Sequence, residues 1–494
     1  MGYMKSQNTT LKAALLGAAA ILASPAVAGE AEDALIAKVV DAYGGAALTN
    51  LKSIRVQDVS QNAFPGQGYT PGYVELTALK QDAQLDLANE RGSVEGWASN
   101  YNFAFNTRAV SVGDDIVTIN YRNGTYQPGS SPDFYAAYGA VIRITDTLLA
   151  YELAKRPNTA ELQGEAIYLG RPHQRISFEM PSSPPLTLYV DKQTGLIGKM
   201  ARETGFGALT YQFGGHAKAS GVTYATKFHF FVGDDPNIIN VSRTVTVNGV
   251  RNTAFRIDRG VVEEPERVDG SEMTVDAIGE GVHFAGQSPA GGAGAYTAFI
   301  DAGDHVIAVG GYAGLQARYD AYKEAAGHAK PVRYQIVTHH HTDHLGGLAE
   351  AFALGAHFVT PANAVDNLNT AAGEAIAEDR LTVLDGKMTL GPVEIYDIYT
   401  NHMESMALVY IPSVKAVFQA DHYTSMYTGD ALSPAGRGTV MLKEAIEALG
   451  LDVDTVLSAH GRKAISWAEF VSAAASYDPD PCPANRAICR GAAD

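Results

Sequence analysis

The chain has 494 residues, of which 46% are hydrophobic and 18% charged, and its formal net charge is −17 at pH 7. This composition is that of a globular protein and excludes a disordered one. An acidic chain without a basic run repels phosphate backbones, so we expect no nucleic-acid partner. The length exceeds what one hydrophobic core usually supports, which predicts two domains.

Residues 1–28 have the pattern of a secretory signal peptide. Lys5 and Lys12 precede an apolar run, AALLGAAAILA. SPAVA follows, with Ala26 and Ala28 as the small residues of a cleavage site. The apolar run is shorter than the roughly 20 residues that a membrane span needs. We therefore expect cleavage after Ala28 and a soluble, periplasmic or secreted protein without a stable membrane anchor. The alternative is an uncleaved anchor.

Residues 29–267 are predicted to form a mainly antiparallel β domain after a short helix. Gly44 and Gly45 end this helix, whose apolar residues share one face: Leu35, Ile36, Val39, Val40 and Tyr43. Alternating or aromatic-rich segments such as SIRVQDVS, LTLYV and KFHFFVG follow, with turn signals such as DKQTG between them. Few helical stretches are visible, and parallel strands need crossover helices, so antiparallel pairing is favoured.

Two segments of this region, AYGGAALTNLKSIRV and LYVDKQTGLIGKM, resemble pieces of the half-barrel of periplasmic lipoprotein carriers of the LolA and LolB type. The resemblance covers scattered fragments. It implies an apolar cradle inside a possible half-barrel. A structural module without a ligand is the alternative.

Residues 273–475 are predicted to form an α/β domain. The polar segment VVEEPERVDGSE separates it from the preceding strands. FIDAGDHVIAVGG predicts two short strands, GLQARYDAYKEAAG a helix and VRYQIVT a buried strand. Strands that alternate with helices indicate a layered α/β domain.

The segment IVTHHHTDHLGG places four of the chain's 14 histidines and one aspartate within six positions. Alternate residues of an extended chain point to the same side, so His339 and His341 can bind one metal ion. The chain then turns into the predicted helix LGGLAEAFA, and at that turn Asp343 and His344 can face a second ion. His340 points to the opposite side and is predicted to lie behind the ligands or at the surface. Imidazole and carboxylate suit zinc, and also iron, manganese or cobalt.

The spacing His339-x-His341-x-Asp343-His344 resembles the HxHxDH motif of the metallo-β-lactamase superfamily. That family requires three further ligands downstream, and residues of the required type follow in the expected order at strand boundaries: His402, Asp421 and His460. The resemblance covers residues 273–475. It implies a four-layer αββα fold, with two sheets between helices, after the N-terminal β domain.

The same resemblance implies a role for each of these seven residues. The ligands of the first metal ion would be His339, His341 and His402. Those of the second would be Asp343, His344 and His460. Asp421 corresponds to the carboxylate that bridges two ions, zinc above all, and Asp343 would also orient the nucleophile and relay its proton.

Neighbouring residues receive more ordinary interpretations. His357 and His422 are predicted to be structural. Tyr423 could donate a hydrogen bond to a developing oxyanion, and ordinary core packing is the alternative. The residues around His402, NHMES, differ from the GHTPGS-like loop of many relatives, so the substrate class cannot be inferred from them. The short segment after His460 argues against the alkylsulfatase-like branch.

Residues 476–494 form the predicted C-terminal tail, which carries both cysteines of the chain, Cys482 and Cys489. In an exported protein a local disulfide between them is expected. Two free thiols are the alternative.

The expected function is metal-assisted hydrolysis of an ester, lactone or amide bond, including a β-lactam, in a small-molecule substrate. Three alternatives stay open: a mononuclear iron thiol dioxygenase, a phosphodiesterase or sulfatase, and a non-catalytic lipid-binding module. The complete set of ligand residues argues against the binding module, and the absence of evident cationic groups near the motif argues against phosphate and sulfate esters. The sequence predicts neither the substrate nor the oligomeric state.

Overall fold

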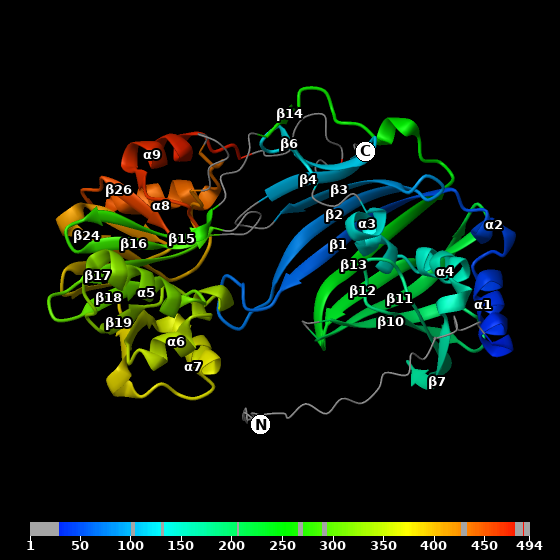
Figure 1. Cartoon of the computed structure of the whole chain (residues 1–494), viewed down its shortest axis with the longest axis horizontal. Helices are drawn as coiled ribbons and strands as arrows, with labels where there is room; N and C mark the ends of the chain where they lie inside the picture. Colours follow the sequence, from blue (N-terminus) through cyan, green and yellow to red (C-terminus); the bar gives the residue numbers. More distant parts are fainter. Residues whose placement is uncertain are drawn as a thin grey trace, which may run out of the picture.

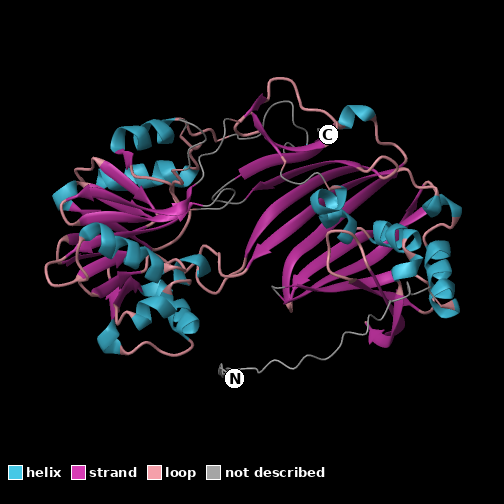
Figure 2. Cartoon of the chain, viewed as in Figure 1, coloured by secondary structure: helices cyan, strands magenta, loops and turns pink. Residues whose placement is uncertain are grey.

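The computed structural model describes residues 29–99, 104–129, 133–204, 207–264, 270–288, 294–425, 432–479 and 488. The predicted signal peptide and the predicted disulfide lie outside these ranges. The described chain is mixed α/β and dominated by three sheets (Figure 2). None of the helices described has the length and apolar character needed to cross a bilayer.

The N-terminal part, residues 29–264, contains one sheet with 14 strands in the described chain. Its strands lie in the order β14-β6-β5-β4-β3-β2-β1-β13-β12-β11-β10-β9-β8-β7. Neighbours pair antiparallel except β14, which runs parallel to β6. The strands are β1 (Ser53–Phe64), β2 (Glu75–Asp86), β3 (Arg91–Ser99), β4 (Ala104–Val112), β5 (Asp115–Asn120), β6 (Thr125–Pro128), β7 (Glu161–Tyr168), β8 (Arg171–Phe178), β9 (Leu186–Asp191), β10 (Ile197–Thr204), β11 (Gly207–Ala219), β12 (Val222–Val232), β13 (Asp235–Val247) and β14 (Val262–Glu263).

Helices cover one face of this curved sheet and enclose the core of the N-terminal part (Figure 1). They are α1 (Glu30–Ala42), α2 (Ala46–Thr49), α3 (Phe134–Arg143) and α4 (Asp146–Lys155). The first helix was expected from its apolar face, whereas α3 and α4 were not. Most of α4 is buried, including Asp146 and Glu152, so it lacks the polar stripe that identifies a surface helix in a sequence.

The C-terminal part, residues 270–479, begins with a sheet whose seven described strands lie in chain order from β15 to β21. The first four pair antiparallel and the last four pair parallel. The strands are β15 (Gly270–Gly279), β16 (Val282–Ser288), β17 (Ala295–Asp301), β18 (Val306–Val309), β19 (Val332–Ile336), β20 (His357–Pro361) and β21 (Leu381–Leu384). Helices α5 (Leu315–Ala326), α6 (Leu348–Ala353) and α7 (Val365–Ala372) share an apolar cluster with this sheet.

A second sheet of the C-terminal part has six described strands, also in chain order. They are β22 (Lys387–Leu390), β23 (Val393–Ile398), β24 (Met406–Ile411), β25 (Ala416–Gln419), β26 (Thr455–Ser458) and β27 (Ile465–Ser466). One apolar cluster joins residues of both sheets with residues of α8 (Arg437–Ala448) and α9 (Trp467–Ala475). Figure 2 shows helices on both sides of the strands in this part.

The strand directions bring several loops to one edge of the C-terminal part. β18, β19 and β20 run parallel, so the loops that follow their carboxyl ends lie beside one another. β25 and β26 also run parallel in the other sheet. Loops after the carboxyl ends of such strands are where α/β proteins place their chemistry.

Candidate metal centre

The histidine-rich segment follows β19, whose last two residues, Gln335 and Ile336, are buried. β19 ends at Ile336, and the chain continues extended through His341 before the 3-10 turn η3 (Thr342–Leu345) leads into α6. Gly347 is needed in this turn, because a Cβ there would lie 2.3 Å from the backbone oxygen of Tyr312. The extended stretch directs alternate histidines to one side, and the turn brings the next two polar residues to the same place.

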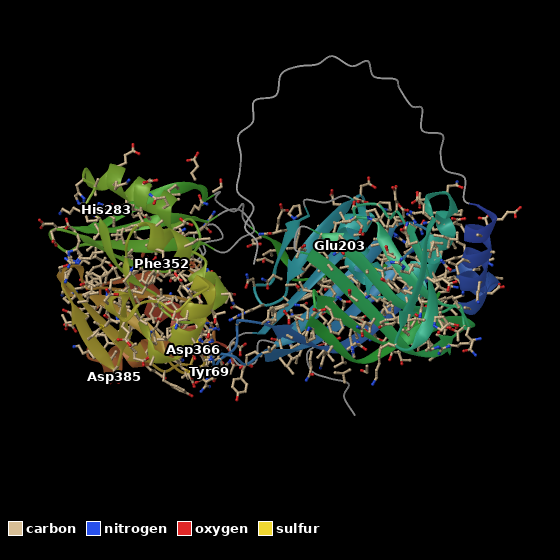
Figure 3. The ribbon with its side chains drawn as sticks, turned by 90° about the horizontal axis from the view of Figure 1, so that it is seen from below. Tyr69, Glu203, His283, Phe352, Asp366 and Asp385 are labelled. Atoms are coloured by element: carbon tan, nitrogen blue, oxygen red, sulfur yellow. The ribbon has the colours of Figure 1, made fainter. Side chains whose placement is uncertain are left out.

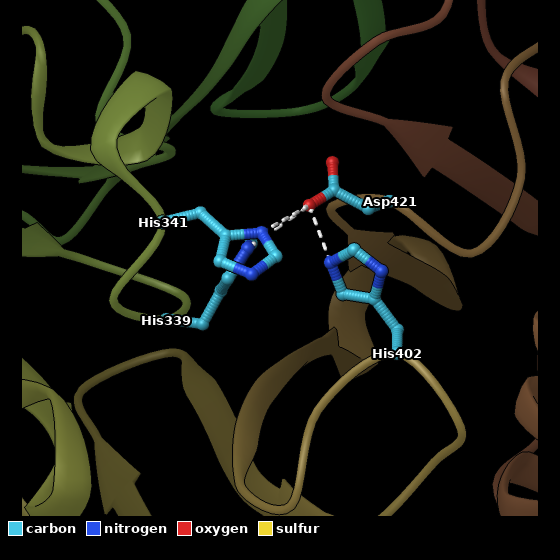
Figure 4. Close-up of side chains that lie close together, drawn as sticks. All are labelled: His339, His341, His402 and Asp421. Atoms are coloured by element: carbon cyan, nitrogen blue, oxygen red, sulfur yellow. Dashed lines mark ion pairs between the residues drawn. The ribbon is translucent and has the colours of Figure 1, made fainter. Parts of the chain in front are cut away.

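The structure brings all seven predicted ligand residues together in two groups. His402 comes from the loop between β23 and β24, Asp421 follows β25, and His460 follows β26. Within each group the ligand atoms lie within 4.8 Å of one another. The deep group is His339, His341, His402 and Asp421 (Figure 4). The mouth group is Asp343, His344 and His460.

The carboxylate of Asp421 lies between the two groups. Its Oδ2 atom is 3.0 Å from the Nε2 atoms of His339, His344 and His402, and 4.0 Å from Nδ1 of His341. Its Oδ1 atom is 3.0 Å from Nε2 of both His344 and His460. Oδ2 thus contacts the deep histidines, Oδ1 contacts His460, and His344 contacts both oxygens, so the carboxylate touches both groups as a bridging ligand would.

The electrostatics of the two groups differ. Burial, and then His402, lowers the pKa of His341 to about 3. Burial and His344 lower the pKa of His339 well below its ordinary value. At the mouth, burial opposes the charged form of His460, but Asp421 and Asp343 outweigh it and raise the pKa to about 10. His339 and His341 are therefore neutral at pH 7, whereas the neighbouring carboxylates keep His460 positively charged.

Backbone carbonyls fix which nitrogen of two rings faces Asp421. Nδ1 of His460 lies 3.0 Å from the oxygen of Gly294, and Nε2 of His341 lies 3.2 Å from the oxygen of Gly68. Because a carbonyl only accepts hydrogen bonds, each of these nitrogens is the donor. His341 is neutral, so its other nitrogen, Nδ1, presents a lone pair toward the Asp421 carboxylate, whereas His460 is protonated and donates from Nε2 as well. A lone pair facing a carboxylate oxygen is unfavourable unless a cation lies between them, so this donor set fits a metal ion.

Tyr312 belongs to the site although it lies outside the HxHxDH motif. It lies in the loop after β18, 6% exposed, and its hydroxyl is 2.8 Å from Nε2 of His344 and 2.6 Å from Nε2 of His460. Burial, and then Asp421 and Asp343, holds the pKa of Tyr312 well above its ordinary value. A signal was available in the sequence VGGYAG, because a glycine pair after a buried strand permits close approach to the site. A Cβ at Gly311 would lie 1.8 Å from the oxygen of His344.

The other residues that the sequence singled out lie outside both groups. His340 is buried with its Nε2 atom 3.0 Å from the oxygen of Gly68, so it is not a surface residue. His357 contacts Thr382 Oγ1 at 2.7 Å on the parallel strands, in the structural setting expected for it.

His422 and Tyr423 follow Asp421 directly. His422 is buried beside His402, with ring centroids 5.8 Å apart, and its Nε2 atom lies 2.6 Å from Thr400 Oγ1. Tyr423 donates to the oxygen of Ser433 at 3.0 Å and its ring contacts Phe470 of α9, which agrees with the packing alternative.

No protein-family model matches the chain, and no curated protein is similar to it in sequence at a significant level. Solved structures of metallo-β-lactamases are similar to part of it. That from Hirschia baltica is 19% identical, with 41% of this chain and 96% of that chain covered and a TM-score of 0.32. That from Erythrobacter litoralis is 18% identical, with 43% and 100% covered and a TM-score of 0.33. A mono-zinc form from Pseudomonas aeruginosa is 18% identical, with 44% and 99% covered and a TM-score of 0.33. Similarity at this level assigns no activity, so the function is argued from the residues of the site.

Proposed function

We propose that the protein is an exported, metal-dependent hydrolase of the metallo-β-lactamase kind, with two sheets between helix layers and zinc as its metal. The observation that carries the proposal is the position of Asp421. Its Oδ2 atom lies 3.0 Å from imidazole nitrogens of His339 and His402 in the deep group, and its Oδ1 atom lies 3.0 Å from that of His460 in the mouth group. Both oxygens lie 3.0 Å from Nε2 of His344. A purely structural zinc site needs four ligands in a closed shell, whereas here seven ligand-type residues form two adjoining groups.

The deep group would hold one ion through His339, His341 and His402, and the mouth group a second through Asp343, His344 and His460, with Asp421 shared. When bound, such ions make water nucleophilic by lowering its pKa from about 15.7 to about 7, and they polarise a carbonyl. No serine or cysteine nucleophile is then required.

Asp343 is the residue of the site that is placed to handle the proton. Its side chain is 40% exposed, the largest exposed fraction in the mouth group, and Oδ2 lies 3.4 Å from Nε2 of His460. Burial works against its ionised form, but the hydrogen bond from His460 and the charge of His344 hold the pKa of Asp343 below its ordinary value. The carboxylate is therefore ionised at neutral pH and can orient a water molecule and accept its proton.

An uncharged acyl compound fits this site better than an anionic ester. Among the described residues, the contacts of Asp343 and Asp421 come from histidines, Gln67 and Tyr312 rather than from lysine or arginine. A phosphodiester or sulfate would need cationic groups to balance the leaving anion. We therefore propose esters, lactones and amides, including β-lactams, as the substrate class.

The test combines metal analysis with a substrate panel on purified mature protein. We expect two zinc ions per chain and hydrolysis of at least one ester, lactone or β-lactam, lost on chelation and restored by Zn²⁺. One iron per chain with oxygen consumption on thiols would instead support the dioxygenase. Full activity in metal-free protein would refute the proposal.

A further inference from the structure

The loop between β1 and β2, residues 65–74, extends from the N-terminal sheet to the metal centre. Figure 1 shows it reaching the C-terminal part, and Figure 3 labels Tyr69 at the junction of the two parts. The amide nitrogen of Thr342 donates to the oxygen of Gly66 at 3.2 Å, so the loop is joined to the backbone of the histidine motif itself. Residues more than 270 positions apart in the sequence are thereby brought into contact.

The side chain of Gln67 contacts a residue of the mouth group. Its Nε2 atom donates to Oδ1 of Asp343 at 2.9 Å and lies 3.3 Å from Oγ1 of Thr342. This hydrogen bond occupies one carboxylate oxygen of Asp343. The other oxygen, Oδ2, lies toward Nε2 of His344 and His460 at 3.5 and 3.4 Å. Gln67 therefore determines which oxygen of Asp343 faces the site.

The backbone of the next residue contacts the deep group. The oxygen of Gly68 accepts from Nε2 of His341 at 3.2 Å, which turns Nδ1 of that ring toward Asp421. The same oxygen accepts from Nε2 of His340 at 3.0 Å. Hydrogen bonds of this kind to the second nitrogen of a ligating imidazole orient the ring and fix its tautomer.

Glycine is required at two positions of the loop, at one by the contact with the motif and at the other by the fold of the loop itself. A Cβ at Gly66, where φ is +71°, would lie 2.4 Å from Cγ2 of Thr342. A Cβ at Gly68 would lie 2.3 Å from the oxygen of Tyr73. The ring of Tyr69 also meets that of Tyr399, three positions before His402, at 6.4 Å and 81°. The loop thus contacts two parts of the site, the histidine motif and the segment that precedes His402.

We infer that the 65–74 loop is a positioning element of the metal centre, in which Gln67 orients Asp343 and the Gly68 carbonyl orients His341. The inference rests on the proposed metal site and gives the N-terminal sheet a role in it. The C-terminal part supplies all seven ligand residues, and the N-terminal part holds one residue of each group in its binding orientation.

The test measures metal affinity in the full-length protein, by competition of Zn²⁺ with a chromophoric chelator and by the absorption spectrum of the Co²⁺-loaded protein. Gln67→Ala should lower the affinity for the mouth ion by about 10- to 100-fold, the range for residues that orient metal ligands. It should also change the Co²⁺ spectrum. Gln61→Ala is the matched control, because Gln61 is an exposed glutamine within β1, paired with Ala78 and Ile239 in the sheet.

A second variant removes the Gly68 carbonyl as well, by replacing residues 65–74 with Asn-Gly. Phe64 pairs with Glu75 across the two strands, so a two-residue turn can close the hairpin in the same register. This variant should weaken both ions while its melting temperature shows that the sheet is retained. Wild-type protein that binds no Zn²⁺ would refute the proposed function. Wild-type protein that binds Zn²⁺, with both variants binding equally well, would refute the inference about the loop alone.

Discussion

The deep and mouth groups are built from the same residue types but are held in place in different ways. In the deep group the side chains of His339, His341 and His402 are 0%, 3% and 7% exposed. In the mouth group the side chains of His460 and Asp343 are 17% and 40% exposed, and only that of His344 is fully buried, at 0%. Burial among neighbouring side chains, together with the hydrogen bond from His341 to the Gly68 carbonyl, fixes the deep group. The exposed residues of the mouth group depend more on single hydrogen bonds: Gln67 donates to Asp343, and His460 contacts Tyr312 and donates to the Gly294 carbonyl. We therefore expect substitutions to affect the two groups unequally.

The largest effect is expected from Asp421→Ala, because this carboxylate contacts both groups. Its loss removes the shared ligand and the negative charge that both ions would face. Metal content should fall at both sites, and activity should fall by more than the ~100-fold upper end for residues that only orient ligands. Metal analysis and kcat/KM measure this. A variant that keeps one tightly bound ion would show that the two groups do not share Asp421.

The next largest effect is expected from Asp343→Asn, which removes a charge from the mouth group only. The deep ion should be retained and the mouth ion weakened. The kcat should fall about 10²- to 10⁴-fold, the range for loss of a general base. His339→Ala is the comparison, since it should remove the deep ion, which Asp343→Asn retains. If Asp343→Asn lowered KM and kcat together without loss of metal, Asp343 would not be a ligand.

An intermediate effect is expected from Tyr312→Phe. The ring still fills its place, but the hydroxyl that contacts His344 and His460 at 2.8 and 2.6 Å is lost. The hydroxyl lies beside the nitrogens that would bind the mouth ion, so it is placed to act as a further oxygen ligand of that ion. Affinity for the mouth ion should therefore fall by about 10-fold, with the deep ion unchanged. Chelator competition measures this directly. An unchanged affinity at both sites would show that Tyr312 only packs there.

The smallest effect is expected from His340→Ala. Its ring lies outside both groups, and the Gly68 oxygen that it contacts still accepts from His341. Activity should fall by less than ~10-fold, the smallest loss expected for a residue that orients a ligand. His357→Ala, remote from the centre, is the matched control for loss of a half-buried or buried histidine. A His340→Ala variant as inactive as His341→Ala would mean that the ligand register is wrong.

The sequence predicted the seven residues of the site far better than the surrounding residues that position them. The spacing of His339, His341, Asp343 and His344 is a local pattern, and the alternation of an extended chain followed by a turn is enough to place these side chains together. His402, Asp421 and His460 each stand at a strand boundary that the apolar pattern reveals. The structure places all seven together, while their binding of metal stays a prediction.

What the sequence could not provide are contacts between distant segments. Nothing near Gln67 or Gly68 indicates that a hairpin turn in the N-terminal sheet meets the motif more than 270 residues later. Helix α4 was missed because its burial on nearly every side removes the amphipathic pattern. The division into two domains, the half-barrel resemblance and the export of the chain stay predictions.

Stepwise removal of zinc tests the two-group account most directly. Wild-type protein loaded with Zn²⁺ is dialysed against increasing chelator, and bound zinc and activity are measured at each step. The account predicts two ions per chain that leave in separate steps, with the mouth ion lost first and selectively destabilised in Tyr312→Phe. A single ion per chain, or two ions that leave together and respond equally to Tyr312→Phe, would contradict it.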